Sequence, residues 1–268
     1  MLIATAESCL DSSTAKYVID EKTTIRTALG KKFLVEITEA GLVLVAGPAS
    51  RNQMKTLFHI AKKYKPYKIL IDGALYRRSI ASPILSDGII FVTGASYSSD
   101  MKKVIKDTKS IIDQLSIKSI KMPENMYENS SENTLLYYEN TMKSIFIAES
   151  LINEEKLLEK HINPNLTHLY LPGALTDRIV EVLLNNVSEI NELQIIVQDS
   201  SFILIKPENY EKLAKKQIKI NVLNQIEILF VAYNPVSPFS YDFDNLEFKS
   251  KLSEELTFVP INILQDLR

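Results

Sequence analysis

Short apolar runs rich in β-branched residues alternate along the chain with segments whose apolar residues recur at helical spacing. The runs at 33–37 and 42–46, separated by an acidic turn that ends at Gly41, predict two strands joined as a hairpin. Further runs predict strands at 68–71, 88–93, 168–171, 193–197, 218–222, 228–232 and 259–263. Repeated strand–helix–strand order is typical of parallel sheets with helices on their faces, so the pattern predicts an α/β fold.

Helical periodicity is clearest in the segment that begins at Ser50. Met54, Leu57, Phe58 and Ala61 fall on one face of a helix that extends to position 64, and Ser50 is suited to cap its N-terminus. Similar spacing predicts helices at 99–115, 174–185, 207–216 and 248–256, the third of which has a proline in its first turn. The predicted helices therefore separate most of the predicted strands.

The segment 122–134 is polar and contains a proline and several asparagines, which indicates a connection between lobes. We therefore expect a Rossmann-like architecture of mostly parallel sheets with flanking helices in two lobes, 1–121 and 135–268, joined by this linker. The pattern G-A-L-x-x-R occurs at 73–78 and again at 173–178, each time after a predicted strand. Either an internal duplication or a coincidence explains this repeat.

Charge and cysteine content narrow the classes of partner and compartment. The chain has 31 Lys and Arg against 33 Asp and Glu, so no excess of positive charge is available to neutralise phosphates and a general nucleic-acid binder is not expected. The single cysteine, Cys9, cannot form an internal disulfide and suits a reducing compartment as a small buried side chain. No run approaches the ~18 apolar residues of a membrane span, so we expect a cytoplasmic protein without a membrane partner.

Polar residues follow several predicted strands, in the position where ligands bind in open parallel sheets. The candidate ligand- or partner-facing residues are Asp72, Gly73, Arg77, Arg78, Ser82, Thr93, Gly94 and Ser96 in the first lobe, with Arg178 and Asn234 in the second. Helix N-termini and arginine side chains favour anions, so a phosphorylated or carboxylated ligand fits this edge. The alternative is that these residues are ordinary helix caps and surface ion pairs.

The sequence shows no complete catalytic constellation. Gly30-Lys31-Lys32 lacks both the upstream glycine and the Ser or Thr of a phosphate loop, and no G-x-G-x-x-G or G-x-S-x-G occurs. The three histidines lack the spacing of zinc ligands. Asp72 and Asp87 are the best available acid–base pair. We therefore assign no catalytic residue, no metal site and no bound cofactor.

The segment 234–243 leaves a predicted buried strand and carries two prolines and three aromatic residues. The prolines stiffen the backbone, and a rigid aromatic loop at a strand end is a good recognition surface. Alternatively, the aromatic side chains cover the core, in which case Asn234 is the residue of this loop that faces a ligand or partner.

Several short motifs occur together in an order and spacing that resemble a known family. They are LIATAESCL at 2–10, AGP at 46–48, IDGAL at 71–75, RSIASP at 78–83, TGAS at 93–96, GALTDR at 173–178 and NPVSP at 234–238. Together they resemble the reactivase subunit that accompanies lysine 5,6-aminomutase and related ornithine aminomutases, across nearly the whole chain. The resemblance implies an accessory protein, rather than a complete enzyme, in lysine or ornithine degradation.

The resemblance also implies partners. These aminomutases use adenosylcobalamin and pyridoxal phosphate, and their radical chemistry inactivates them when the cobalamin is damaged. The reactivase is expected to act with an ATPase resembling MutS and to restore the aminomutase by exchanging the damaged cofactor. Family members have a glycine- and lysine-containing phosphate loop upstream of the segment matched by 2–10, and this chain begins at Met1. We therefore expect nucleotide and Mg²⁺ to bind only if such a loop precedes this segment.

Two other classes of function stay open on the sequence. A hydrolase or transferase that handles phosphate or carboxylate groups would need Asp72 and Arg78 for turnover. A regulatory module that binds a small anion or nucleotide would need no protein partner.

Overall fold

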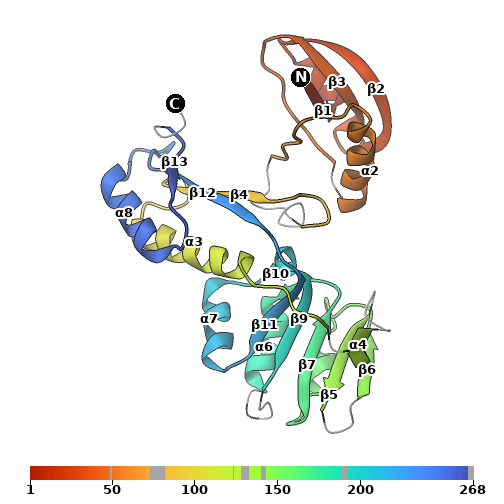
Figure 1. The fold of residues 1–268 in the computed structure, drawn as a ribbon, viewed down its shortest axis with the longest axis vertical. Helices are drawn as coiled ribbons and strands as arrows, with labels where there is room; N and C mark the ends of the chain where they lie inside the picture. Colours follow the sequence, from red (N-terminus) through yellow and green to blue (C-terminus); the bar gives the residue numbers. More distant parts are fainter. Residues whose placement is uncertain are drawn as a thin grey trace. The chain divides into compact units, whose positions relative to one another are not determined.

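The computed structural model describes residues 1–48, 50–72, 82–122, 124–127, 133–139, 143–186, 188 and 192–264. The chain folds into two compact units, Met1–Ile80 and Ala81–Arg268, which is a different division from the one expected at 122–134. The expected division grouped 88–115 with the N-terminal strands, whereas these residues belong to the second unit. Each unit is described by itself (Figure 1).

The first unit contains an antiparallel sheet of three strands. Its strands are β1 (Leu2–Ala6), β2 (Lys16–Thr27) and β3 (Gly30–Glu39), in the order β1-β3-β2. Gly30 adopts a φ of +94° where the chain turns from β2 into β3, a conformation that favours glycine. The short helix α1 (Glu7–Asp11) contributes Leu10 to a small core with Phe33 and Val35. Cys9 is buried, as expected.

The helix expected from Ser50 onward is confirmed as α2 (Arg51–Lys62). The Ser50 hydroxyl accepts a hydrogen bond from the Gln53 backbone N–H at 3.3 Å and so caps the helix. Met54 and Leu57 are buried on its apolar face. The sequence pattern therefore located this helix and its cap correctly.

Two strands expected in this unit are wrong. Residues 42–46 and 68–71 lie outside the strands, and Leu42 and Leu70 are 80% and 87% exposed. Because β3 is paired with β1 on one side and β2 on the other, it has no free edge for 42–46. The backbone there bonds to threonine side chains instead: the Thr5 hydroxyl donates to the Leu44 carbonyl at 2.6 Å, and the Leu42 N–H donates to the Thr14 hydroxyl at 2.8 Å.

The larger sheet of the second unit has the strand order β11-β9-β7-β5-β6. Its strands are β5 (Thr134–Tyr138), β6 (Lys143–Ala148), β7 (Leu166–Leu171), β9 (Gln194–Asp199) and β11 (Lys219–Asn224). The strands β7, β9 and β11 are parallel, as the strand–helix–strand pattern predicted, whereas β5 runs antiparallel to both β6 and β7. The sheet is therefore mixed.

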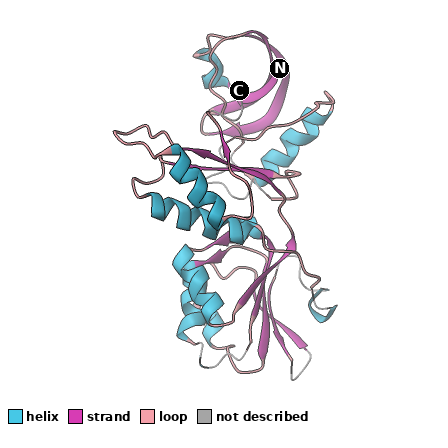
Figure 2. Cartoon of the chain, turned by 60° about the vertical axis from the view of Figure 1, so that its left-hand side comes forward, coloured by secondary structure: helices cyan, strands magenta, loops and turns pink. Residues whose placement is uncertain are grey.

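Both faces of this sheet are covered. The helices α6 (Asp177–Asn185) and α7 (Pro207–Lys215), with the short α5 (Lys156–Glu159), pack their apolar side chains on Leu169, Leu171, Ile195 and Val197. Figure 2 shows helices along one side of this sheet. The opposite face buries Tyr170 and Ile196 with methionines around α4 (Glu124–Tyr127). Alternate residues of β7 and β9 thus point to two cores, as the period of a strand requires.

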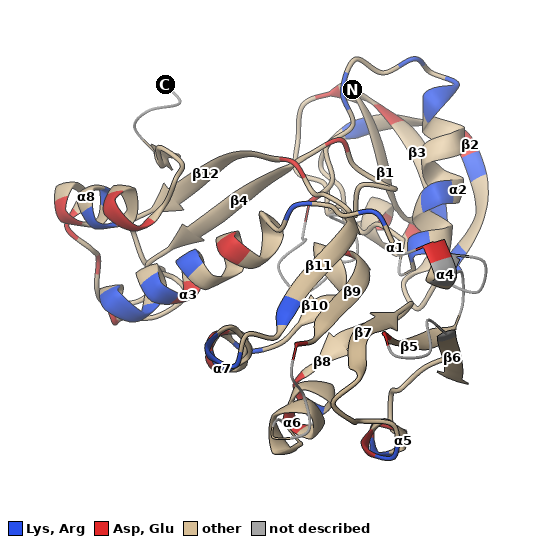
Figure 3. Ribbon diagram, turned by 60° about the horizontal axis from the view of Figure 1, so that its bottom comes forward, with Lys and Arg blue, Asp and Glu red and all other residues tan. Residues whose placement is uncertain are grey.

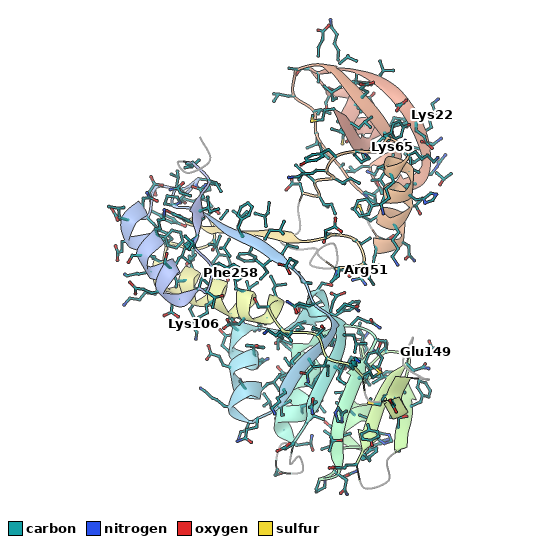
Figure 4. The ribbon with its side chains drawn as sticks, in the orientation of Figure 1. Lys22, Arg51, Lys65, Lys106, Glu149 and Phe258 are labelled. Carbon is teal, nitrogen blue, oxygen red and sulfur yellow. The ribbon has the colours of Figure 1, made fainter. Side chains whose placement is uncertain are left out.

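The second sheet of this unit is parallel and has the order β13-β12-β4. It consists of β4 (Ile89–Gly94), β12 (Ile228–Asn234) and β13 (Ile261–Asn262), and helices α3 (Met101–Leu115) and α8 (Asn245–Glu255) pack on it. Neither β4 nor β12 carries a charged residue (Figure 3). On α3, Lys106 pairs with Glu211 of α7 at 3.1 Å, which joins this layer to the larger sheet (Figure 4).

A two-stranded parallel ladder of β8 (Leu175–Thr176) and β10 (Ile203–Leu204) completes the described strands, and the 3-10 helix η3 (Ser200–Phe202) precedes β10. The protein is therefore a mixed α/β protein with parallel and mixed sheets. No helix within the described part of the chain combines the length and apolarity needed to cross a membrane.

Candidate functional site

Three of the expected site residues meet where β4 and β12 end. Thr93 and Gly94 are register partners of Tyr233 and Asn234, and the Ala95 N–H donates to the Asn234 carbonyl at 3.0 Å. Ser96 follows immediately and is exposed. Because β4 and β12 are parallel, their carboxyl ends lie at one edge of the sheet, which is where ligands bind in open α/β sheets. We call residues 93–97 and 234–244 the β4–β12 edge.

A glycine is required in this edge by close backbone contact. A Cβ added at Gly94 would lie 2.2 Å from the Asn234 carbonyl oxygen, which no side chain can accommodate. The neighbouring Thr93 hydroxyl is 2.7 Å from the Thr108 hydroxyl of α3. Thr93 therefore fastens the strand to the helix, and its hydroxyl is already used within the fold.

The loop that follows Asn234 is held by local hydrogen bonds. The Asn234 Oδ1 accepts from the Val236 N–H at 3.0 Å, and the Asp242 Oδ1 accepts from the Ser237 N–H at 2.8 Å. The Phe243 N–H donates to the Pro235 carbonyl at 2.9 Å. These contacts, together with two prolines, fix the shape of the loop.

The loop is also tied to the end of β4. The Tyr241 hydroxyl donates to the Ala95 carbonyl at 2.8 Å, so one contact joins the two segments of the β4–β12 edge across 146 positions of sequence. Of the three aromatic residues, Phe243 is buried and packs edge-on against Phe248 at 5.0 Å between ring centroids, while Phe239 is 66% exposed and stacks on Tyr241. Phe243 thus covers the core, whereas Phe239 is exposed as a recognition surface requires, so each of the two interpretations applies to part of the loop.

The remaining expected site residues lie elsewhere. Ser82 is fully buried and donates to the Asp199 Oδ2 at 2.6 Å, at the carboxyl end of β9. Arg178 is on the surface of α6, and its Nη1 is 3.4 Å from the Asn153 Oδ1. Asp72 is exposed in the first unit, and Gly73, Arg77 and Arg78 lie outside the described residues. The Asp87 side chain is exposed in the second unit.

A network of asparagines near the same edge was not expected from the sequence. The Asn245 Oδ1 accepts both from the Tyr233 hydroxyl at 2.9 Å and from the Asn262 Nδ2 at 2.7 Å. These residues end β12, begin α8 and end β13, so the network fixes the C-terminal ends of two strands relative to the start of a helix. The sequence feature that could have indicated this network is an asparagine at the end of an apolar run, a feature that also occurs at Asn234.

The titratable groups in the described ranges do not form a metal site. No three His, Cys, Asp or Glu side chains there come together in a way that could hold a metal ion. His168 on β7 lies edge-on to Tyr137 with ring centroids 5.6 Å apart, and its burial lowers the imidazole pKa below 6.5. His59 is exposed on α2.

Comparison of the chain with protein-family models, with curated proteins and with solved structures found no match. The geometry of the β4–β12 edge is therefore the main structural guide to function. It offers hydroxyl and amide groups that are largely used within the fold, beside aromatic side chains presented on a fixed loop.

Proposed function

We propose that this chain is an accessory subunit that binds a partner enzyme through the β4–β12 edge. The observation that carries the proposal is the loop 234–243, which is fastened by its own hydrogen bonds and by Tyr241 yet leaves Phe239 exposed. An aromatic ring held on a rigid loop loses little conformational entropy on binding, and such residues anchor protein–protein interfaces. Tyr97, at the other segment of the edge, is also exposed.

The chemistry of the edge favours binding over turnover. The Thr93 hydroxyl is used on α3, the Asn234 Oδ1 on the loop, and one oxygen of Asp242 on the Ser237 N–H. An acid–base mechanism would need two titratable groups converging on one substrate position. Neither Asp72 nor Asp87, the acid–base pair considered from the sequence, belongs to the β4–β12 edge.

The sequence motifs support a specific partner for this accessory role. We propose a cobalamin- and pyridoxal-phosphate-dependent amino-acid aminomutase as the enzyme served, with a MutS-like ATPase as the second partner. The β4-β12-β13 layer, parallel and covered by α3 and α8, is compatible with a Rossmann-like architecture. No residue of the chain is assigned to nucleotide or Mg²⁺.

A tagged pull-down from source cells grown on amino acids, read by mass spectrometry, tests this proposal. We expect the wild-type chain to retain an aminomutase subunit or the ATPase, and a Tyr97→Ser, Phe239→Ser double variant to lose it. Ile152→Ser is the matched control, because Ile152 is also an exposed apolar residue of the second unit but lies outside the edge.

Three results separate the alternatives. Equal recovery by the double variant would remove the β4–β12 edge from the proposal. Recovery of neither partner would contradict the accessory role. In that case, a thermal shift with phosphate, nucleotides, cobalamins or amino acids would favour a small-ligand protein instead.

A further inference from the structure

The β4–β12 edge has an uneven distribution of charge. From residue 220 to residue 248 the sequence contains no Lys or Arg, but it contains Glu227, Asp242, Asp244 and Glu247. Asp242 and Asp244 directly follow the exposed aromatic part of the loop and are themselves exposed. The segment that carries Phe239 is therefore acidic although the whole chain is close to neutral.

The two carboxylates are fixed but not neutralised. The Asp242 Oδ1 accepts from the Ser237 N–H at 2.8 Å, and the Asp244 Oδ1 accepts from the Glu247 N–H at 2.8 Å as the cap of α8. No Lys or Arg within the described ranges forms an ion pair with either side chain, whereas Glu247 is paired with Lys251. Each carboxylate thus keeps an oxygen for an external cation.

The aromatic pair supplies a second feature that attracts cations. Phe239 and Tyr241 stack with their ring centroids 6.3 Å apart and an interplanar angle of 20°, and Phe239 is 66% exposed. The face of an aromatic ring attracts Lys and especially Arg, whose planar guanidinium stacks on the ring and can also donate to a carboxylate. A phosphate-rich surface would be repelled by the same carboxylates.

We propose that the loop 235–244 binds an arginine- or lysine-bearing segment of a partner protein, with the cation on the Phe239 ring and beside Asp242 and Asp244. This inference rests on the proposed accessory role and specifies the chemistry of the partner surface. Electrostatic attraction between such surfaces mainly accelerates association, while the ring contact slows release.

Fluorescence anisotropy with a labelled hexa-arginine peptide tests the proposal, with a hexa-glutamine peptide of equal length as the neutral probe. The variants are Phe239→Leu, which keeps an apolar side chain but removes the ring, and the double variant Asp242→Asn, Asp244→Asn. The asparagine side chains remove the charge but keep an Oδ1 that can accept from the same backbone N–H groups. Glu255→Gln removes one charge from the exposed end of α8 and serves as the control. Thermal melting of each variant verifies that it is folded.

We expect Phe239→Leu to weaken hexa-arginine binding roughly threefold, as for an exposed cation–π contact. The double Asp→Asn variant should weaken it by roughly three- to tenfold at low salt and less at high salt, because exposed charges are screened. The control should bind like the wild type. Equal binding by the wild type, Phe239→Leu and the double Asp→Asn variant would overturn the inference, and so would equal affinity for hexa-glutamine.

The same variants distinguish this inference from the proposed function. If the pull-down retains the aminomutase or the ATPase equally with Phe239→Leu and the double Asp→Asn variant, the accessory role stands and the basic-segment inference fails. If the peptide results follow expectation but neither partner is recovered, the loop binds cations and the accessory role fails.

Discussion

Gly94 and Asn234 lie so close that a Cβ at position 94 would be 2.2 Å from the Asn234 carbonyl oxygen. These two residues end neighbouring parallel strands, and 140 positions of sequence separate them. The absence of a side chain at position 94 therefore permits the backbone geometry on which the whole β4–β12 edge is built.

Gly94→Ala should destabilise the protein by about 1–3 kcal/mol, because the added methyl group must push β4 away from β12. A shift in the urea midpoint without a change in slope would measure this loss. Gly173→Ala is the matched control in the same unit, because nothing lies within 4 Å of the position of its added Cβ. Equal midpoints for the two variants would contradict the close contact.

Ser82→Ala should destabilise the protein by about 1–3 kcal/mol, because it leaves a buried carboxylate short of a hydrogen bond. Ser82 and Asp199 are both fully buried, and Asp199 would keep the hydrogen bond from the Ser201 N–H at 2.9 Å. Thermal melting measures the loss. Ser86→Ala is the control, since its hydroxyl makes only a 3.5 Å contact to the Ser82 carbonyl; a loss as large as that of Ser82→Ala would argue against the Asp199 contact as the cause.

The hydrophobic pattern predicted which segments form most elements, but not which segments pair. The predicted strands 33–37, 88–93, 168–171, 193–197, 218–222 and 228–232 correspond to β3, β4, β7, β9, β11 and β12. The failures, 42–46 and 68–71, have the same apolar composition. Whether such a run becomes a strand depends on the pairing that the fold allows. Since β1 and β2 occupy both edges of β3, the run 42–46 cannot form the expected hairpin with it.

One strand that the pattern did not predict, β2, fails for the opposite reason. β2 carries Lys16, Asp20, Glu21, Lys22 and Arg26, and this density of charge conceals its alternation. It is a strand because β3 offers it a ladder of hydrogen bonds and a small apolar face. Local composition thus carries little information where a neighbouring strand determines the structure.

The sequence indicated some residues of the β4–β12 edge but not their assembly. Thr93, Gly94 and Asn234 were each expected at the carboxyl end of a strand, and each is found there. Their assignment to two lobes separated residues that the β4–β12 pairing brings together. Strand order is set by packing between distant segments, so periodicity cannot reveal it. The partner of Ser82, Asp199, could not be inferred for the same reason.

The stability of the second unit should fall as the pH drops below about 6.5, because burial lowers the pKa of His168 in the folded state. Above this pH the imidazole is neutral in both states and contributes no pH dependence. Below it, the unfolded chain binds the proton first, so unfolding becomes more favourable until the folded pKa is reached. Urea midpoints between pH 5 and pH 8 should show this slope, and His168→Gln should reduce it. His59→Gln, on an exposed residue, should leave it unchanged.

Tyr241→Phe should loosen the β4–β12 edge while leaving the strands intact. The variant keeps the ring that packs beside Phe239 and Phe243 but removes the hydroxyl that donates to the Ala95 carbonyl at 2.8 Å. The expected loss of stability is about 1 kcal/mol, the typical net value of one hydrogen bond.

Hydrogen exchange should accelerate at the backbone amides of 236–243 and of 95–97, because this contact joins the two segments. Tyr210→Phe is the control: Tyr210 lies on α7, outside the β4–β12 edge, and its hydroxyl makes no hydrogen bond within the described part of the chain, so this variant should leave exchange in both segments unchanged. If Tyr241→Phe accelerates exchange in only one segment, the hydroxyl does not couple them, and the rigidity of the loop must come from its prolines and local bonds alone.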